Sequence, residues 1–223
     1  MIANQERARI IREIEHIGVV AVIRLHDARQ LRSVTEALAA GGVRAIEITM
    51  TVPGAVGLIE ELTSSLKSEF IIGAGTVLDP ETAREVILAG AKFVVSPVFK
   101  TSLIEVGHKY DVPVMPGCFS PTEILSAWEA GADVVKVFPA TSLGPSFFKD
   151  IRGPLPQLRL MPTGGVTREN AGDWIRAGAV AIGAGTALVD SKAVAERRFD
   201  VITANARHFI EAVQRARVSE AGG

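Results

Sequence analysis

The sequence predicts an α/β fold, and more narrowly a (β/α)8 or TIM barrel with an extra N-terminal helix. A helix-like segment ending in Ala-Gly, followed by a short run rich in Val and Ile, recurs along the 223 residues. Runs that are apolar throughout are typical of strands buried on both faces of a parallel sheet. Eight alternating units without a second domain favour closure into a barrel, so we expect residues 1–223 to form a single domain.

The repeat is clearest in four places, and each predicts a helix end, a turn and a strand. A glycine just past a helix adopts the left-handed conformation that caps the last carbonyl groups. The four copies lie at residues 39–49, 88–96, 129–138 and 176–185. In chain order, strands are expected near residues 18–24, 43–49, 70–75, 92–96, 112–116, 133–138, 158–162 and 179–183.

Helix starts are marked between these strands. Ser120 and Glu123 have the spacing of a capping box, with proline at the first helical position between them. Asp79 precedes a proline in the same manner. Amphipathic helices are also expected near residues 4–16, before the first strand, and near residues 193–217, after the last one.

The structural alternative is an open, doubly wound parallel sheet. Such a fold normally carries a glycine-rich fingerprint after its first strand, where a dinucleotide binds. Here the first strand ends in the stretch from Arg24 to Asp27, which contains no glycine. This argues against a dinucleotide site.

Composition excludes several classes of function. The 24 Lys and Arg residues balance 25 Asp and Glu residues, which gives no general reason to bind nucleic acid or a membrane surface. The single cysteine, Cys118, excludes an internal disulfide and a multi-cysteine zinc site. A charged N-terminal segment without a secretory apolar core leads us to expect a cytoplasmic protein. No metal or cofactor is expected, because the histidines are scattered without metal-ligand spacing: His16, His26, His108 and His208.

Lys136 is a charged residue within an otherwise apolar predicted strand. It shares one face of its strand with Val134 and Phe138, so it points into the barrel if the neighbouring valines pack under the helices. Burial disfavours the charged ammonium group, and a neutral amine attacks a carbonyl carbon to form a Schiff base. The alternative is a lysine that pairs with an inward carboxylate for structural reasons alone.

Glu47 breaks the pattern of the second predicted strand in the same way. It shares a face with Ala45 and Thr49, which places it inside the same barrel as Lys136. Schiff-base chemistry needs repeated proton transfers, and a partly buried glutamate suits that task. Glu47 is therefore predicted to be the general acid/base, or simply to neutralise Lys136.

Other candidates follow strands at the expected mouth of the barrel. Thr76 and Arg24 are candidates for binding a carboxylate, although Arg24 could equally pair with Asp27. Glycine loops after the seventh and eighth strands have the position that binds phosphate in these barrels. The loop residues expected to bind phosphate are Gly164, Gly165, Gly185 and Thr186, and the residues expected to shape the pocket include Ser96, Pro97 and Thr163.

Together these motifs resemble the class I 2-keto-3-deoxy-6-phosphogluconate aldolases, which overlap with the 4-hydroxy-2-oxoglutarate aldolases. The resemblance extends from about residue 18 to residue 188. The segments that carry it are residues 42–49, 72–77, 95–97, 115–117, 121–123, 135–139 and 162–166.

The resemblance implies a homotrimer, without a metal, that cleaves a 2-keto acid sugar phosphate reversibly to pyruvate and glyceraldehyde 3-phosphate in the Entner–Doudoroff pathway. It implies that Lys136 is the Schiff-base lysine, Glu47 the acid/base residue and Thr76 a ligand of the pyruvyl carboxylate. Phe138 would line that pocket, and the glycine loops would hold the phosphate.

One position departs from the family pattern. Many members have an arginine two residues after the threonine that corresponds to Thr49, and that arginine contacts the substrate carboxylate. Here the position is Thr51, which leaves Arg24 and Thr76, with Thr51, to bind the anion. The galactonate epimer and unphosphorylated 4-hydroxy-2-oxoglutarate are therefore alternative substrates.

Two rival functions remain open. A phosphosugar isomerase or epimerase would use the same two glycine loops but would not need a neutral lysine. A non-catalytic sensor of sugar phosphates would bind its ligand without turnover.

Overall fold

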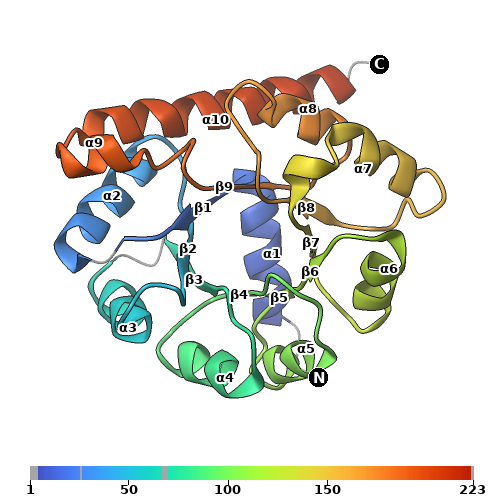
Figure 1. Ribbon diagram of the computed structural model, residues 1–223, viewed down its shortest axis with the longest axis horizontal. Coiled ribbons are helices and arrows are strands. Elements are labelled where there is room, and N and C mark those ends of the chain that lie inside the picture. The colour runs from blue at the N-terminus through green and yellow to red at the C-terminus, as the bar shows by residue number, and fades with distance from the viewer. Residues whose placement is uncertain (1–4, 26, 67–69, 222–223) are drawn as a thin grey trace.

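The computed structural model describes residues 5–25, 27–66 and 70–221. Parallel strands curl around the centre of the molecule, and most helices lie outside them (Figure 1). One sheet has the order β5-β4-β3-β2-β1-β9 and the other the order β6-β7-β8. Isolated parallel bridges, Leu160 to Ala179 and Thr163 to Gly183, connect the region of β8 with that of β9. The predicted α/β class is therefore confirmed.

The strands fall where the repeat predicts them, and the fifth one is interrupted. Pro116 separates β5 from β6, because proline has no N–H to donate to a sheet. Its carbonyl oxygen still accepts a hydrogen bond from the Lys136 N–H at 2.9 Å. The strands are β1 (Val19–Ile23), β2 (Ala45–Thr49), β3 (Ile71–Gly75), β4 (Val94–Val95), β5 (Val114–Met115), β6 (Gly117–Cys118), β7 (Val135–Val137), β8 (Leu160–Pro162) and β9 (Ile182–Ala184).

The two helix N-caps predicted from the sequence are present in the structure. Ser120 and Glu123 form the capping box, and the Asp79 side chain accepts from the Thr82 N–H. The helices are α1 (Gln5–Ile17), α2 (Ala28–Ala40), α3 (Ala55–Ser65), α4 (Pro80–Leu88), α5 (Thr101–Lys109), α6 (Pro121–Glu129), the 3-10 helix η1 (Ala140–Ser142), α7 (Pro145–Arg152), α8 (Ala171–Arg176), α9 (Ser191–Ala195) and α10 (Phe199–Ala221).

A long helix follows the last strand, as predicted near residues 193–217, but it begins later, at Phe199. Two helices, α9 and α10, occupy this stretch. Arg197 lies between them with φ 57°, a left-handed conformation that an α-helix cannot contain. Its N–H donates to the Val194 carbonyl oxygen, which ends α9.

Alternation along the strands creates two separate apolar clusters. One alternate set packs under the outer helices and includes Val135 and Val137. The other set includes Ala45 and Val134 and packs against Ile10, Ile11 and Ile14 of α1. Helix α1 thus closes one end of the space enclosed by the strands, and the residues on the same strand faces as Ala45 and Val134 point into that space.

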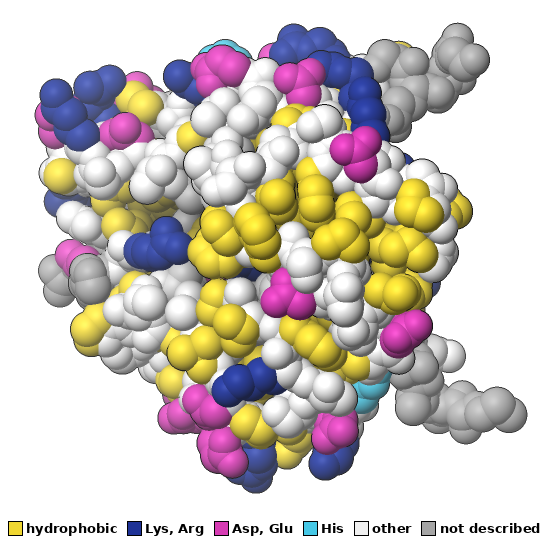
Figure 2. All heavy atoms as spheres, turned by 45° about the vertical axis from the view of Figure 1, so that its right-hand side comes forward, with side chains coloured by type: hydrophobic (Ala, Val, Ile, Leu, Met, Phe, Trp, Pro, Cys, Tyr) yellow, Lys and Arg dark blue, Asp and Glu magenta, His cyan; other side chains and the backbone are white. Residues whose placement is uncertain are grey.

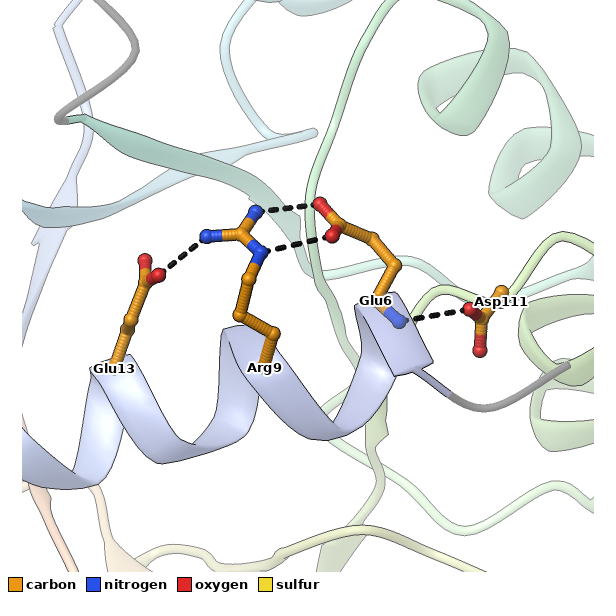
Figure 3. Close-up of polar contacts among 4 residues, drawn as sticks. All are labelled: Glu6, Arg9, Glu13 and Asp111. Atoms are coloured by element: carbon orange, nitrogen blue, oxygen red, sulfur yellow. Dashed lines mark hydrogen bonds and ion pairs between the residues drawn. The ribbon is translucent and has the colours of Figure 1, made fainter. Parts of the chain in front are cut away.

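Charged contacts hold α1 in this position. The Glu6 N–H donates to the Asp111 carboxylate at 3.0 Å, a favourable place for a negative charge at a helix N-terminus (Figure 3). At the other end, Arg217 of α10 donates to the carbonyl oxygens of Glu15 and His16. Arg9 pairs with Glu6 and Glu13 along the helix (Figure 3).

Two ion pairs join α1 to residues that lie just before β7 and β8. Arg7 Nε lies 3.0 Å from Asp133 Oδ1, and Arg159 Nη2 lies 2.5 Å from Glu15 Oε1. Burial raises the pKa of Asp133, while the nearby cations, Arg7 first among them, oppose this rise.

In the part of the chain that the structure describes, none of the helices has the length and hydropathy needed to span a membrane.

Candidate active site

Polar residues and glycines replace large apolar residues toward the carboxyl ends of the strands. Glu47, Lys136 and Thr163 are all buried there. Glycines on β3, β6 and β9 stand at the same end, at positions 75, 117 and 183. Gly73 of β3 serves the core instead, because a Cβ atom there would lie 2.5 Å from the ring of Phe93, which belongs to the interior apolar cluster.

Lys136 lies on the inward face of β7, as predicted. Its side chain shares this face with Val134 of the interior cluster, and residue 136 is only 5% exposed. Nζ lies 4.9 Å from the centroid of the Phe138 ring. Among the described residues no carboxylate forms an ion pair with this amine. Lys136 thus has no direct ion pair there, although its charge acts on the buried carboxyl group of Glu47.

Glu47 lies on the inward face of β2, directly opposite Gly73 of β3 in the register of the two strands. It is 1% exposed, and burial raises the pKa of its carboxyl group. The charges of Lys136 and Arg24 act in the opposite direction, which shows that both groups are within electrostatic reach of Glu47. Oε2 has no hydrogen-bond partner in the described part of the chain. A buried polar atom without a partner is available to a ligand.

The three candidates for carboxylate binding follow neighbouring strands. Arg24 comes directly after β1 and is exposed. Thr76 comes directly after β3 with φ 61°, a strained conformation for a β-branched residue of the kind that clusters at functional sites. Thr51 is exposed two residues after β2, and its hydroxyl lies 2.8 Å from that of the buried Thr49.

Two further predicted pocket residues follow β4. Ser96 is fully buried, and its hydroxyl accepts from the Val98 N–H at 3.2 Å. Pro97 is half-buried, and its backbone lies against Gly117, where a side chain would not fit. Cys118 is buried beside it, and burial raises the pKa of its thiol to about 12, so this cysteine is inert at neutral pH.

The two glycine loops form the wall of one cavity of about 130 Å³. Gly164 and Gly165 have φ values of 89° and 71°, which glycine adopts without strain. The predicted residues that line the cavity are Arg24, Phe138, Thr163, Gly164, Gly165, Gly185 and Thr186. The lining does not include Lys136, Glu47, Thr51, Thr76, Ser96 or Pro97.

Two residues connect this cavity with the buried pair. Phe138 lines the cavity and also lies next to the Lys136 amine. Arg24 lines the cavity and acts electrostatically on Glu47. The Lys136 amine and the Glu47 acid are thus linked, through Phe138 and Arg24, to a cavity that is lined by the two glycine loops and by the Arg24 guanidinium group.

Sequence reasoning missed the residue that supports the first glycine loop. Asn170 Nδ2 donates to the Gly165 carbonyl oxygen at 2.9 Å, and Asn170 Oδ1 accepts from the Thr167 N–H at 2.8 Å. The signal was present, since Thr167 and Asn170 have the spacing of a local side-chain-to-backbone turn.

Residues suited to a metal are not assembled in the described ranges: no three His, Cys, Asp or Glu side chains come close enough to hold an ion. His26 lies outside the described residues.

Comparison with known proteins identifies the family of this chain. Residues 10–205 match the aldolase family described as KDPG and KHG aldolase, where KDPG is 2-keto-3-deoxy-6-phosphogluconate. The chain belongs to the KDPG and KHG aldolase family. This membership confirms the predicted family and the prediction of an aldolase, a carbon–carbon lyase.

Relatives named for two different substrates are similar to this chain. The 2-dehydro-3-deoxy-phosphogluconate aldolase of Pseudomonas aeruginosa is 37% identical over 87% of this chain and 88% of its own. The 2-dehydro-3-deoxy-6-phosphogalactonate aldolase of Escherichia coli K12 is 34% identical over 78% of this chain and 85% of its own.

A solved structure shows the same fold. The KDPG aldolase of Legionella pneumophila, determined with pyruvate captured as a covalent carbinolamine intermediate, superimposes with a TM-score of 0.82 at 30% identity. The similarity covers 91% of this chain and 97% of the other chain.

Proposed function

We propose that this protein is a class I aldolase that cleaves 2-keto-3-deoxy-6-phosphogluconate reversibly to pyruvate and glyceraldehyde 3-phosphate. The observation that carries the proposal is the buried Lys136 amine, which forms no ion pair among the described residues and lies within electrostatic reach of the buried Glu47. An amine in such surroundings is an effective nucleophile toward a ketone.

The first half of the reaction attaches the substrate. Lys136 Nζ forms a bond to C2 of the 2-keto acid, and the carbonyl oxygen takes a proton to give a carbinolamine. Glu47 protonates the departing hydroxyl group, which leaves as water, and a protonated imine remains. The raised pKa of Glu47 suits this task, because burial favours the protonated carboxyl group, which is the form that can give a proton to the departing hydroxyl group.

The second half breaks the carbon–carbon bond. Glu47, now ionised, removes the proton of the C4 hydroxyl group. The electrons of the C3–C4 bond move into a C2–C3 double bond, and the imine π electrons pass to nitrogen, so glyceraldehyde 3-phosphate leaves. Protonation at C3 and addition of water then release pyruvate and restore the amine.

The remaining predicted residues bind the two anionic ends of the substrate. Gly164, Gly165, Gly185 and Thr186 hold the phosphate with backbone N–H groups, next to the positive charge of Arg24 at the wall of the same cavity. Arg24, Thr76 and Thr51 hold the carboxylate, and Ser96, Pro97, Phe138 and Thr163 shape the space between.

The exact substrate depends on position 51. A threonine there offers one hydroxyl group where many relatives offer two parallel guanidinium donors, so carboxylate binding relies on fewer charge-assisted bonds. The alternative substrates are 4-hydroxy-2-oxoglutarate and 2-keto-3-deoxy-6-phosphogalactonate.

The architecture that we propose is a single (β/α)8 domain over residues 1–223, with α1 as the extra helix. The bridges between the regions of β8 and β9, together with the pairing of β9 with β1, support closure of the barrel. We also propose a cytoplasmic homotrimer. Leu78, Val98 and Phe119 expose large apolar side chains on loops after neighbouring strands, and Figure 2 shows hydrophobic side chains gathered on one face.

A comparison of rates tests the proposed function. Pyruvate release is followed with a coupled assay on the gluconate and galactonate substrates, each with and without phosphate, and on 4-hydroxy-2-oxoglutarate. We expect the highest kcat/KM with the phosphorylated gluconate. An isomerase, an epimerase or a sugar-phosphate sensor would release no pyruvate from any of them.

A further inference from the structure

The Glu47 side chain lies along the backbone of Gly75. A Cβ atom at position 75 would overlap the Glu47 carboxyl group and would lie 2.5 Å from Glu47 Cγ. Glu47 is on β2 and Gly75 is two residues beyond its register partner Gly73 on β3. The glutamate side chain therefore leans toward the carboxyl end of the neighbouring strand, into the space that a side chain at position 75 would occupy.

Hydrogen bonds do not fix the carboxyl group of Glu47 in this place. Oε2 has no partner, and neither oxygen forms a hydrogen bond or ion pair within the described ranges. Packing against Gly75 therefore helps to determine where the carboxyl group lies, together with the charges of Lys136 and Arg24.

The backbone under the carboxyl group is held from both sides. The Gly75 carbonyl oxygen accepts from the Met50 N–H at 2.8 Å, and the Val77 N–H donates to the Val95 carbonyl oxygen at 3.1 Å. Gly75 is thus bound to the strands on either side of β3 through its own carbonyl and through the turn that follows. A larger residue here cannot be accommodated by moving the backbone without breaking these bonds, so the glutamate must move instead.

Gly75 does not need to be glycine for conformational reasons. It is not among the glycines with positive φ, unlike Gly164 and Gly165 in the predicted phosphate loop. Alanine is therefore compatible with the backbone at position 75, and the side chain of Glu47 is the feature that excludes it.

We propose that Gly75 is a positioning residue that directs the Glu47 carboxyl group toward the substrate bound to Lys136. This inference rests on the proposed function, because it assumes that Glu47 carries out the proton transfers. Gly75 does not touch the reacting atoms and acts only through Glu47.

Proton exchange on pyruvate separates this role from a structural one. When pyruvate is bound as the imine, Glu47 removes a C3 proton, the C–H electrons form the C2–C3 double bond and the imine π electrons pass to nitrogen. Return of a deuteron from D2O labels the methyl group, which NMR follows directly. For Gly75→Ala we expect exchange to fall about a hundredfold, as for a lost general base. The fraction of Lys136 trapped by borohydride at equilibrium with pyruvate should stay close to that of the wild type.

Gly73→Ala is the matched control on the same strand. Its Cβ atom would meet the Phe93 ring and not the glutamate, so it should lower Tm while the exchange rate per trapped lysine stays within about threefold of the wild type. An equal loss of exchange per trapped lysine in both variants would overturn the proposal.

A shortened acid provides a test by rescue. Glu47→Asp alone should slow exchange, because the carboxylate is withdrawn from the substrate. In the Gly75→Ala background the same change should speed exchange, because the shorter side chain relieves the overlap. If Glu47→Asp slows both backgrounds equally, or if Gly75→Ala alone exchanges like the wild type, position 75 does not direct the acid.

The wild-type trapping reaction distinguishes the two proposals. Trapping at Lys136 combined with normal exchange in Gly75→Ala overturns only the role of Gly75. Absence of trapping in the folded wild type overturns the proposed function and the role of Gly75 with it.

Discussion

Lys136 Nζ lies 4.9 Å from the centroid of the ring of Phe138, the residue that directly follows β7. The Phe138 ring is part of the wall of the cavity, and the amine has no carboxylate in ion-pairing contact among the described residues.

Glu47→Gln should separate binding from turnover. The amide preserves the shape of the side chain and cannot transfer protons, so we expect kcat to fall by at least about a hundredfold. Pyruvate should still be trapped on Lys136 at equilibrium. A turnover rate near that of the wild type would remove Glu47 from the acid/base role.

The same variant should change the pH dependence of stability. Because burial raises the pKa of Glu47 above its value in the unfolded chain, its contribution to stability is present at acidic pH and is lost as the pH rises through the folded-state pKa. Glu47→Gln has no such loss. Its Tm should exceed that of the wild type by about 2–4 °C at pH 8, which is about 1 kcal/mol for a chain of this size.

The advantage should disappear toward pH 3, well below the ordinary glutamate pKa of about 4.3, where the carboxyl group is protonated in both states. Thermal unfolding across this range checks the prediction. A constant difference in Tm at every pH would show that the effect does not come from ionisation of Glu47.

Gly165→Ala should weaken phosphate binding selectively. The residue has φ 71°, and a Cβ atom there would lie 2.9 Å from Thr141 Cα, so the loop must shift. KM for the phosphorylated substrate should rise about tenfold or more, which corresponds to about 1.4 kcal/mol. Formation of the pyruvate adduct should be unaffected.

Gly57→Ala provides the control for this experiment. Position 57 lies within α3, and a Cβ atom there would meet nothing within 4 Å. Both kinetic constants should remain as in the wild type. An equal rise in KM for phosphorylated and unphosphorylated substrates in Gly165→Ala would contradict the assignment of the loop to phosphate.

Arg7→Met should destabilise the attachment of α1. It removes the ion-pair partner of Asp133, whose side chain is only 14% exposed, and we expect a loss of about 2 kcal/mol near pH 8. Since loss of the cation raises the pKa of Asp133 further, the defect should grow as the pH rises and shrink at acidic pH, where the carboxyl group is neutral.

Adding Asp133→Asn to Arg7→Met should recover part of the lost stability at pH 8. A measurement of Tm for the single and double variants at two pH values is sufficient. The same loss of Tm in both variants would mean that Arg7 acts through packing alone.

The sequence was informative wherever local rules decide the structure. Gly42, Gly90, Gly131 and Gly178 all have left-handed φ values, so the repeated Ala-Gly signal located the helix ends correctly. Alternation on β7 placed Lys136 on the inner face, because the face of a strand residue depends only on its position along the strand.

Long-range relationships were out of reach of the sequence. Nothing local links Glu47 to Gly75 or α1 to Asp111 and Arg217, since these contacts depend on how distant segments pack. The break between α9 and α10 was also missed, because Arg197 adopts a conformation that its residue type disfavours.

Borohydride reduction in the presence of pyruvate, followed by peptide mapping, tests the central claim most directly. The account predicts one stable adduct, located on Lys136, in the wild type, and neither adduct nor turnover in a folded Lys136→Met variant. An adduct on a different lysine, or none on the intact folded protein, would contradict it.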